Sequence, residues 1–558
     1  MTPLEQSLIQ EEQQHSHFEN QRRHAAVPTL SLFKTDPEHI CFEPSSLNIP
    51  ASGKQSDSVF PGLAARQDQI VLRAKKGATA IKNKRIAVLF SGGPASGGHN
   101  VVAGIQHALG KHNQLLGVLA GPKGLLEGRF VPLSASKTST VVNLGGFDLL
   151  GSDRTKISTP EQFETVRRVV KNNTIDGIIV VGGDDSNTNA AFLAESLLDL
   201  NCAVIGVPKT IDGDLQLGHL LPISFGFDTA TKIYSEMVGN ILQDTPSSRK
   251  YWHVIKLMGR SASHVALEVA LQTRPPLTLI SEEIRDKKLT LNQVIDRCVE
   301  VVVARAKKGK HYGVILVPEG LIEFIPELNQ LIAGLNDCIG RYGSSWTNLS
   351  FSEQKEICKS TLQANQKTLF FSLPEAIQKQ LLLERDSHGN VQVSQIPTEA
   401  LLIDMIQERL DNVEPAIPFS PIRHFFGYEG RCGAPSAFDA SYTFNLGLIA
   451  GALALTGQTG YMAALSELNQ GGRAYGLPLT AFIQEEQRKG KPTWVIEKAL
   501  VKLESPAFRY FQSRRDHWVT EDSFSSPGPR QFSDPHHLTM PITVALNQGY
   551  QELSFTIK

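Results

Sequence analysis

The stretch DGIIVVGGDDSNTNAAFLAESLLD, residues 176–199, carries the features that decide the fold class. Residues 178–181 form a short run of Ile and Val, a glycine pair follows it, and the next residues carry apolar side chains at helical spacing. A strand that is apolar on both faces and leads through a tight turn into a helix is typical of a parallel sheet covered by helices. The stretch therefore predicts an α/β fold.

The same strand, turn and helix pattern recurs along the chain from residue 85 onward. Further copies or parts of it are RIAVLFSGGPASGGHN (85–100), LLGVLAG (115–121), CAVIGVPKTIDGD (202–214), HVIKLMGRSASHVALEVALQT (253–273) and HYGVILVPEG (311–320). Ligands of such sheets bind outside the carboxyl ends of the strands. We therefore expect the polar clusters that follow these strands to be site residues.

The 558 residues predict several domains. Residues 1–84 contain Gln, His, Ser and scattered Pro, and we interpret them as an extension that wraps the molecule or helps it dimerise; a loosely ordered tail is the alternative. Residues 85–220 and 221–320 are predicted as α/β domains. Residues 321–415 are helical and rich in Gln and Glu, as expected of an insertion. Residues 416–558 are predicted to return to the second α/β domain and end in a tail.

Composition and charge exclude several classes of protein. The 55 basic and 56 acidic residues leave a net charge of −1, which argues against a surface built for nucleic acid or an acidic membrane, although a local basic pocket remains open. No apolar run reaches the length of a membrane span, and the polar N-terminus is not a secretory signal. Six scattered cysteines without a C-x-x-C pair predict a reducing cytoplasm, not a disulfide framework or a zinc cage.

The glycine-rich segment SGGPASGGHN, residues 91–100, is the first candidate binding loop. Glycines let the backbone approach an anion closely, and a helix that begins near Gly98 would aim free N–H groups at it. The segment lacks the Gly-Lys-Ser/Thr of a P-loop. A tight structural turn is the alternative interpretation.

Acidic residues follow the next two strands. Asp184 and Asp185 are adjacent and would repel each other unless a cation lies there, and Mg²⁺ held by one carboxylate and by substrate phosphate oxygens fits this pattern. A helix N-cap is the alternative. In PKTIDGD (208–214), Asp212 is a candidate general base and Lys209 a candidate clamp for phosphoryl charge, unless this is a charged surface turn.

Arginines and a further acid complete the candidate site. Arg260 follows Met258 and Gly259, and Arg431 ends the segment 428–431; arginine matches phosphate oxygens with two parallel hydrogen bonds. Glu319 follows a strand and is a candidate acceptor for a sugar hydroxyl. A lone arginine is more often a solvated surface residue, and Glu319 could be an ordinary loop acid. Together the clusters indicate phosphoryl transfer to a small phosphorylated substrate, with Mg²⁺ and a carboxylate base.

The chain resembles the phosphofructokinase family, and within it the long pyrophosphate-dependent members. The resemblance rests on SGG…GGHN (91–100), GGDDSNTN (182–189), PKTIDGD (208–214), KLMGRSASHVALEVALQT (256–273), PEG (318–320) and GYEGRC (427–432), in family order. It implies a phosphofructokinase-like fold of two Rossmann-like parallel-sheet domains with an inserted helical subdomain and an N-terminal extension. It also implies reversible phosphoryl transfer from pyrophosphate to the 1-hydroxyl of fructose 6-phosphate, a step of glycolysis and gluconeogenesis.

The resemblance also implies a role for each motif. Gly93 would approach the pyrophosphate, Asp184 would hold Mg²⁺, and Asp212 would take the proton of the 1-hydroxyl. The substrate-binding residues it implies are Thr210, Ile211, Asp212, Met258, Gly259, Arg260, Glu319, Tyr428, Glu429, Gly430 and Arg431, joined by Lys250 and Tyr251 of a neighbouring subunit. We therefore expect a homodimer with shared sites.

The choice of donor is predicted from Asp185 and Lys209. ATP-using members carry Gly at both positions, so the Asp185 carboxylate would occupy the space of a nucleotide α-phosphate, and Lys209 would bind a compact donor. An ATP-dependent phosphofructokinase and a non-catalytic regulatory subunit are the alternatives. One position departs from the family pattern: Ser96 stands where Pro usually precedes Gly-Gly-His-Asn, which predicts a less constrained loop.

Overall fold

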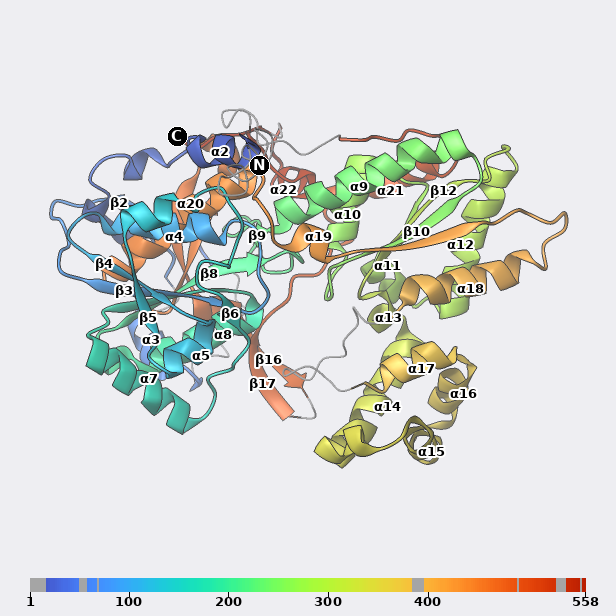
Figure 1. The fold of residues 1–558 in the computed structure, drawn as a ribbon, viewed down its shortest axis with the longest axis horizontal. Coiled ribbons are helices and arrows are strands. Elements are labelled where there is room, and N and C mark those ends of the chain that lie inside the picture. The colour runs from blue at the N-terminus through green and yellow to red at the C-terminus, as the bar shows by residue number, and fades with distance from the viewer. Residues whose placement is uncertain are drawn as a thin grey trace, which may run out of the picture.

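The computed structural model describes residues 17–49, 58–67, 70–383, 396–488, 491–527, 538–551 and 554–558. Two α/β bodies lie side by side along the long axis of the molecule (Figure 1). The first contains a sheet of order β1-β2-β15-β14-β8-β7-β3-β4-β5, and the second a sheet of order β11-β12-β10-β13. The predicted α/β class is confirmed.

The first sheet is parallel in its centre and antiparallel at its edges. The parallel strands are β3 (Arg85–Ser91), β4 (Gln114–Val118), β7 (Gly177–Gly182), β8 (Ala203–Thr210) and β14 (Tyr461–Ser466), joined by short β6 (Ser152–Asp153) and β9 (Phe225–Gly226). The antiparallel strands are β5 (Phe130–Leu133), β15 (Arg473–Pro478), β2 (Leu72–Lys76) and β1 (Ile40–Pro44). An entirely parallel sheet was expected, but the strands at both edges run antiparallel to their neighbours.

Helices cover both faces of this sheet, as predicted. One face is covered by α4 (Gly98–Leu109) and α20 (Ala437–Leu455), and the other by α5 (Gly121–Leu126), α7 (Pro160–Asn173) and α8 (Asp184–Ser196) (Figure 1). A Cβ on Gly104 would lie 2.0 Å from the Phe444 carbonyl oxygen, so α4 and α20 meet backbone to backbone. Among the described residues α20 is the helix long and apolar enough to cross a membrane, but 94% of it is buried in this core.

The second sheet is parallel throughout, and the inserted helices share its core. Its strands are β10 (Trp252–Leu257), β11 (Leu277–Thr278), β12 (Gly313–Pro318) and β13 (Pro421–Phe426). The helices around it are α9 (Phe227–Ser248), α10 (His264–Thr273), α11 (Ser281–Asp286), α12 (Leu291–Ala306), α18 (Thr398–Leu410) and α21 (Pro506–Thr520). The insertion contains α13 (Leu321–Phe324), α14 (Pro326–Tyr342), α15 (Phe351–Thr361), α16 (Ala364–Ser372) and α17 (Glu375–Leu381). Its buried side chains and those of β10 and β12 belong to one hydrophobic cluster.

The C-terminal part of the chain departs from the predicted domain division. Of residues 416–558, β13 belongs to the second sheet, whereas β14 and β15 complete the first one. The N-terminal extension likewise supplies β1 and β2 to the first sheet, next to β15. The sequence did not reveal these pairings, because β14 and β15 lie far along the chain from their partners β8 and β2. Remaining short elements are α2 (His17–His24), α3 (Pro61–Gln67), α6 (Ala135–Ser139), α19 (Tyr428–Arg431), α22 (Ile542–Asn547), β18 (Leu538–Thr539) and β19 (Ser554–Phe555).

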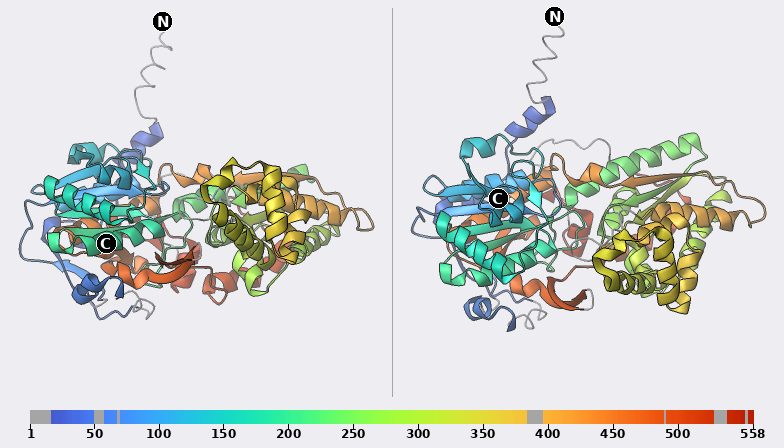
Figure 2. Two further views of the ribbon diagram at one scale, coloured as in Figure 1. Left: turned by 90° about the horizontal axis from the view of Figure 1, so that it is seen from below. Right: turned by 60° about the horizontal axis from the view of Figure 1, so that its bottom comes forward.

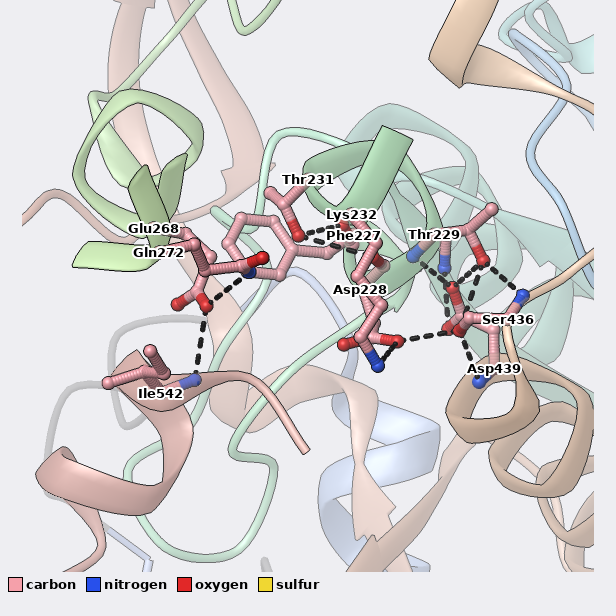
Figure 3. A network of polar contacts seen from close by, with 11 residues as sticks. Phe227, Asp228, Thr229, Thr231, Lys232, Glu268, Gln272, Ser436, Asp439 and Ile542 are labelled. Atoms are coloured by element: carbon pink, nitrogen blue, oxygen red, sulfur yellow. Dashed lines mark hydrogen bonds and ion pairs between the residues drawn. The ribbon is translucent and has the colours of Figure 1, made fainter. Parts of the chain in front are cut away.

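A buried polar network joins α9 to the start of α20 (Figure 3). Asp439 accepts hydrogen bonds from the backbone N–H groups of Gly226 and Thr229, at 3.1 and 2.8 Å, and from the Thr229 hydroxyl at 2.5 Å. Asp228 accepts hydrogen bonds from the Ser436 hydroxyl at 2.6 Å and from Lys232 Nζ at 2.8 Å. Because α9 leads from the first sheet into the second body, this network fixes the junction of the two bodies.

The hairpin β16 (Ile483–Arg488) and β17 (Lys491–Ile496) lies between the two bodies (Figures 1 and 2). The Ile496 backbone N–H donates to Thr188 Oγ1 on α8 at 2.9 Å. Downstream, the Val501 N–H donates to Glu282 Oε1 on α11 at 3.0 Å. The segment after the hairpin is therefore attached to both bodies.

Candidate functional site

A cavity of about 100 Å³ opens beyond the carboxyl ends of β3, β7 and β8. Residues from both bodies line it: Ser91, Gly92, Gly93, Arg154, Thr155, Lys156, Gly183, Asp184, Asp185, Ser186, Asn189, Lys209, Thr210, Asp212, Asp214, Arg260, Ser261 and Lys498. The predicted clusters of the first body thus meet at one place, where strand ends of an α/β sheet place their ligands.

Asp184 and Asp185 occupy the first turn of α8. Gly183 is the N-cap residue, and both it and the two carboxylates line the cavity, so the helix starts at the cavity wall. Carboxylates at this position are stabilised by the positive end of the helix dipole. The hydroxyl of Ser186 donates to Ser91 Oγ at 2.8 Å and thereby holds the α8 turn against the end of β3.

Lys209 is the next-to-last residue of β8. The strand extends to Thr210 because β9 pairs with Lys209 and Thr210. Lys209 is buried, and burial lowers the pKa of its ammonium group to about 8. A buried cation at this position faces the cavity in a setting that strengthens its attraction for an anion.

Asp212 and Asp214 follow β8 in a turn that requires a glycine between them. Gly213 has φ of +74°, in the left-handed region. The Asp212 N–H donates to Thr210 Oγ1 at 3.1 Å, which fixes the backbone below the Asp212 carboxylate. Burial, together with the charges of Asp212 and Asp184, raises the pKa of Asp214 to about 7. Ile211, predicted to line the sugar, is buried within this turn.

The glycine-rich loop divides into two parts. Ser91, Gly92 and Gly93 line the cavity, and a Cβ on Gly93 would lie 3.1 Å from Arg431 Nη2. The later residues face the core instead: the Asn100 amide donates to Asn143 Oδ1 at 2.7 Å and to the Ala440 carbonyl at 2.9 Å. The prediction that α4 aims its N-terminus at the anion is therefore not supported, because the α4 start is buried against α20.

Ser96, which replaces the proline usual in this loop, is fully buried. Its hydroxyl accepts a hydrogen bond from the Gly433 backbone N–H at 2.9 Å. The loop that was expected to be less constrained is thus attached to the segment that carries Arg431.

The second body contributes Met258, Gly259, Arg260 and Glu319 at the end of β10 and β12. The Gly259 N–H donates to Glu319 Oε2 at 2.8 Å, and burial raises the pKa of Glu319 to about 7. A Cβ on Gly320 would lie 2.1 Å from the Arg260 carbonyl oxygen, so this close approach requires glycine. Arg260 lines the cavity, whereas Met258 is buried beside it.

The segment 428–431 forms the short helix α19 at the junction. Its Glu429 accepts a hydrogen bond from the Gly427 N–H at 2.7 Å, and Gly430 packs against the Tyr234 ring. Tyr428 is 68% exposed, and the Arg431 guanidinium lies 5.0 Å from the centre of its ring. The Arg431 guanidinium lies beside Gly93 of the glycine loop, and therefore next to the cavity that Gly93 lines.

Lys250 and Tyr251 lie apart from the other predicted residues. They precede β10, whose six residues separate them from Met258 by about 20 Å. Lys250 is exposed, and its Nζ lies 4.8 Å from the centre of the Tyr251 ring. Within one subunit these residues do not reach the cavity, so their role stays a prediction that concerns a neighbouring subunit.

Several lining residues were missed by the sequence interpretation. Arg154, Thr155 and Lys156 follow β6, a strand of two residues that gives no periodic signal. Lys498 follows β17 and belongs to no recognisable motif. Arg154 and Lys156 could have been noticed as cations beside Gly151, but Lys498 could not.

The carboxylates of the cavity fit a magnesium ion only in combination with substrate oxygens. Among the residues that the structure describes, no group of three or more His, Cys, Asp or Glu side chains is placed to hold a metal alone. Asp184, Asp185, Asp212 and Asp214 nevertheless line the same cavity. Mg²⁺ is commonly bound by one or two carboxylates plus phosphate oxygens and water, which is the donor set available here.

Comparison with known proteins agrees with this geometry. The sequence profile of the family described as "Phosphofructokinase" matches residues 85–453. The pyrophosphate–fructose 6-phosphate 1-phosphotransferase of Treponema pallidum is 47% identical over 464 residues, 81% of each chain. The Arabidopsis thaliana protein named subunit beta 2 of that enzyme is 43% identical over 94% of this chain and 93% of its own. The solved pyrophosphate-dependent phosphofructokinase of Nitrosospira multiformis is 16% identical, with a TM-score of 0.50 over 81% of this chain and 95% of that one.

Proposed function

Since the chain belongs to the phosphofructokinase family, we propose that it transfers a phosphoryl group reversibly between pyrophosphate and the 1-hydroxyl of fructose 6-phosphate. The products in the forward direction are fructose 1,6-bisphosphate and orthophosphate. The observation that carries the proposal is that Asp184, Asp185, Lys209 and Asp212 line one small cavity together with the glycine loop. Relatives that share over 40% of their residues with this chain bear the name of this reaction.

Asp212 is the proposed base of the reaction. It lines the cavity at 8% exposure, and its backbone is fixed by the hydrogen bond to Thr210. The Asp212 carboxylate takes the proton of the 1-hydroxyl as the sugar oxygen attacks the phosphorus, and the bond to the leaving orthophosphate breaks in line. Lys209 and Arg154 line the same cavity and balance the charge of the transferred group, whereas Arg260 is proposed to position the sugar phosphate. Glu319 and the end of β10 are proposed to hold the sugar.

We further propose that a divalent metal ion, Mg²⁺, is held by Asp184 and by oxygens of the bound donor. The ion would neutralise phosphate charge and orient the transferred group. Asp184 suits this role because α8 places its carboxylate at the cavity wall beside Asp185.

The donor is proposed to be pyrophosphate because of Asp185. Asp185 lines the cavity, as required if its carboxylate excludes a nucleotide α-phosphate. The buried Lys209, whose Nζ would lie 3.7 Å from a Cβ on Gly92, supplies positive charge beside the glycine loop.

A donor assay tests the proposal and its alternatives. Purified full-length protein is given fructose 6-phosphate and Mg²⁺ with either pyrophosphate or ATP, and fructose 1,6-bisphosphate is measured. We expect product with pyrophosphate and none with ATP. Equal or faster turnover with ATP would indicate an ATP-dependent phosphofructokinase, and no turnover with either donor would indicate a non-catalytic subunit.

The assembly and the compartment are also proposals. A homodimer with shared sites is supported by the place of Lys250 and Tyr251, outside the cavity of their own subunit. A reducing cytoplasm is supported by the six scattered cysteines.

A further inference from the structure

We propose that Lys498, which follows β17, is a ligand of the pyrophosphate and sets the affinity for the donor. This inference rests on the proposed function and adds a residue to it from a part of the chain that carries no motif. Lys498 lines the cavity together with Asp184, Lys209 and Arg260.

The ammonium group of Lys498 is held between the two bodies. Its Nζ donates a hydrogen bond to Ser261 Oγ at 2.8 Å and lies 3.7 Å from Asp184 Oδ2. Ser261 directly follows Arg260 in the second body, and Asp184 begins α8 in the first. The Lys498 side chain is 27% exposed, so it remains accessible to a ligand in the cavity.

The backbone on both sides of Lys498 is fixed. Two residues earlier, Ile496 is hydrogen bonded to Thr188 of α8. One residue later, the Ala499 N–H donates to the Asp214 carbonyl at 2.7 Å, and the Ala499 carbonyl lies 2.9 Å from His264 Nε2. Because these bonds restrict the segment, the lysine reaches the cavity with little freedom, unlike a surface lysine whose chain must be ordered on binding.

The charges in the cavity give this lysine a function in binding. Among the lining residues, the cations are Arg154, Lys156, Lys209, Arg260 and Lys498, and the carboxylates are Asp184, Asp185, Asp212 and Asp214. Loss of Lys498 would remove one of these five cations from the cavity in which the donor anion is proposed to bind.

A purely structural role is the competing explanation, in which Lys498 only ties the Arg260 loop to α8. The two roles affect different substrates. If Lys498 binds pyrophosphate, its loss weakens the binding of the donor. If Lys498 only tethers Ser261, its loss displaces Arg260 and weakens the binding of the sugar phosphate.

The test compares Lys498→Met with Lys502→Met in the full-length protein. Lys502 is exposed four residues further along the same segment and is the matched control for loss of one cation. The probe is imidodiphosphate with Mg²⁺, an analogue that binds without transferring a phosphoryl group, measured by calorimetry. We expect Lys498→Met to weaken its binding about tenfold or more, consistent with a lost charge-assisted hydrogen bond, and Lys502→Met to leave it unchanged.

Steady-state kinetics separates the two roles. For Lys498→Met we expect the KM for pyrophosphate to rise about as much as the dissociation constant of imidodiphosphate, while the KM for fructose 6-phosphate stays near that of the wild type. Lys498→Arg should recover part of the affinity. Equal imidodiphosphate affinity in wild type and Lys498→Met, or a rise confined to the KM for the sugar, would overturn the role proposed for Lys498.

Further variants guard against a loss of folding. Lys498→Gln removes the charge but retains a hydrogen-bond donor for the Ser261 hydroxyl. If Lys498→Met lowers the melting temperature, Lys498→Gln replaces it in the test, and we again expect weaker binding of imidodiphosphate. Ser261→Ala keeps the cation and removes the tether, and we expect it to change donor affinity less than Lys498→Gln does; the reverse order contradicts the proposal. Wild-type protein that makes no product from pyrophosphate would overturn the proposed function itself, a result separate from the comparison of variants.

Discussion

Asp212 lines the cavity two residues beyond the end of β8, and its substitution tests the proposed chemistry directly. Asp212→Ser removes the base but leaves Arg260, Glu319 and the glycine loop in place. We expect kcat to fall by about a hundred- to ten-thousand-fold, the usual contribution of a general base, while fructose 6-phosphate still binds. Turnover is measured with pyrophosphate, and binding by calorimetry. A rate near that of the wild type would remove Asp212 from the role of base.

Lys209 predicts a pH dependence. Its ammonium is buried, and its pKa is lowered to about 8, so the positive charge is present below that pH and is lost as the pH rises through it. We expect kcat/KM for pyrophosphate to decline above about pH 8. Lys209→Arg keeps its charge at all these pH values and should abolish the decline, even if its rate is lower. An unchanged decline in Lys209→Arg would assign it to another group.

Substitution of Asp185 is predicted to change which phosphoryl donor the protein accepts. Asp185→Gly removes the carboxylate that is proposed to exclude a nucleotide, so we expect slow turnover with ATP and weaker use of pyrophosphate. Asp185→Asn keeps the size but removes the charge, and the comparison shows which property excludes ATP. If neither variant binds or uses ATP, even when combined with Lys209→Gly, the proposed exclusion is wrong.

Single residues could be predicted from the sequence where they follow a recognisable strand. Asp184, Lys209 and Asp212 follow runs of Ile and Val with glycines beside them, and the cavity brings them together. Lys498 could not be predicted, since its position depends on a hairpin that folds back across the molecule. Ser96 shows the same limit, because its hydrogen bond to Gly433 joins residues that are remote in sequence.

At the junction of α9 and α20, we predict that loss of the Asp439 carboxylate strongly lowers the stability of the fold. Asp439 is fully buried and accepts three hydrogen bonds from Gly226 and Thr229. Asp439→Ala leaves these donors buried without a partner, so we expect a loss of roughly 3 kcal/mol in the free energy of unfolding. Asp337→Ala, on the exposed face of α14, is the control. Urea unfolding measures both, and equal midpoints would show that the network contributes little.

The central strands of the two sheets could be predicted from the sequence, but the outer strands of the first sheet could not. Runs such as 178–181 and 313–317 lie within β7 and β12 because buried parallel strands are apolar on both faces. By contrast, β1 and β2 carry side chains of mixed exposure, since they lie at the solvated edge of the first sheet. Their pairing could not be inferred, as β2 and β15 are joined across most of the chain.

At the scale of the whole molecule, the chain crosses between the two bodies more often than the sequence indicated. After β13 it returns to the first body through α20, β14 and β15, and the segment after β17 leads again to the second body, where α21 packs. These crossings place residues of both bodies around one cavity. Closure of the two bodies on the substrates would therefore act on the donor side and the sugar side together.

The predicted sharing of sites between subunits is testable at this same scale. Lys250 and Tyr251 lie about 20 Å along β10 from Met258, so the proposal requires them to act at the sugar site of a neighbouring subunit. Asp212→Ser and the double variant Lys250→Ala, Tyr251→Ala should each be nearly inactive alone. When the two are refolded or expressed together, the mixed dimer contains one intact site, built from Asp212 of one chain and Lys250 of the other.

Random pairing makes half of the dimers mixed, each with one intact site of two, so we expect about a quarter of the wild-type activity. The control mixes Asp212→Ser with Lys209→Gly, because both changes affect the cavity of their own subunit. That mixed dimer still carries one damaged cavity in each chain, so no activity should be regained. If the control pair regained activity, or if the pair of Asp212→Ser with Lys250→Ala, Tyr251→Ala did not, the proposal that Lys250 and Tyr251 act across the dimer would be wrong.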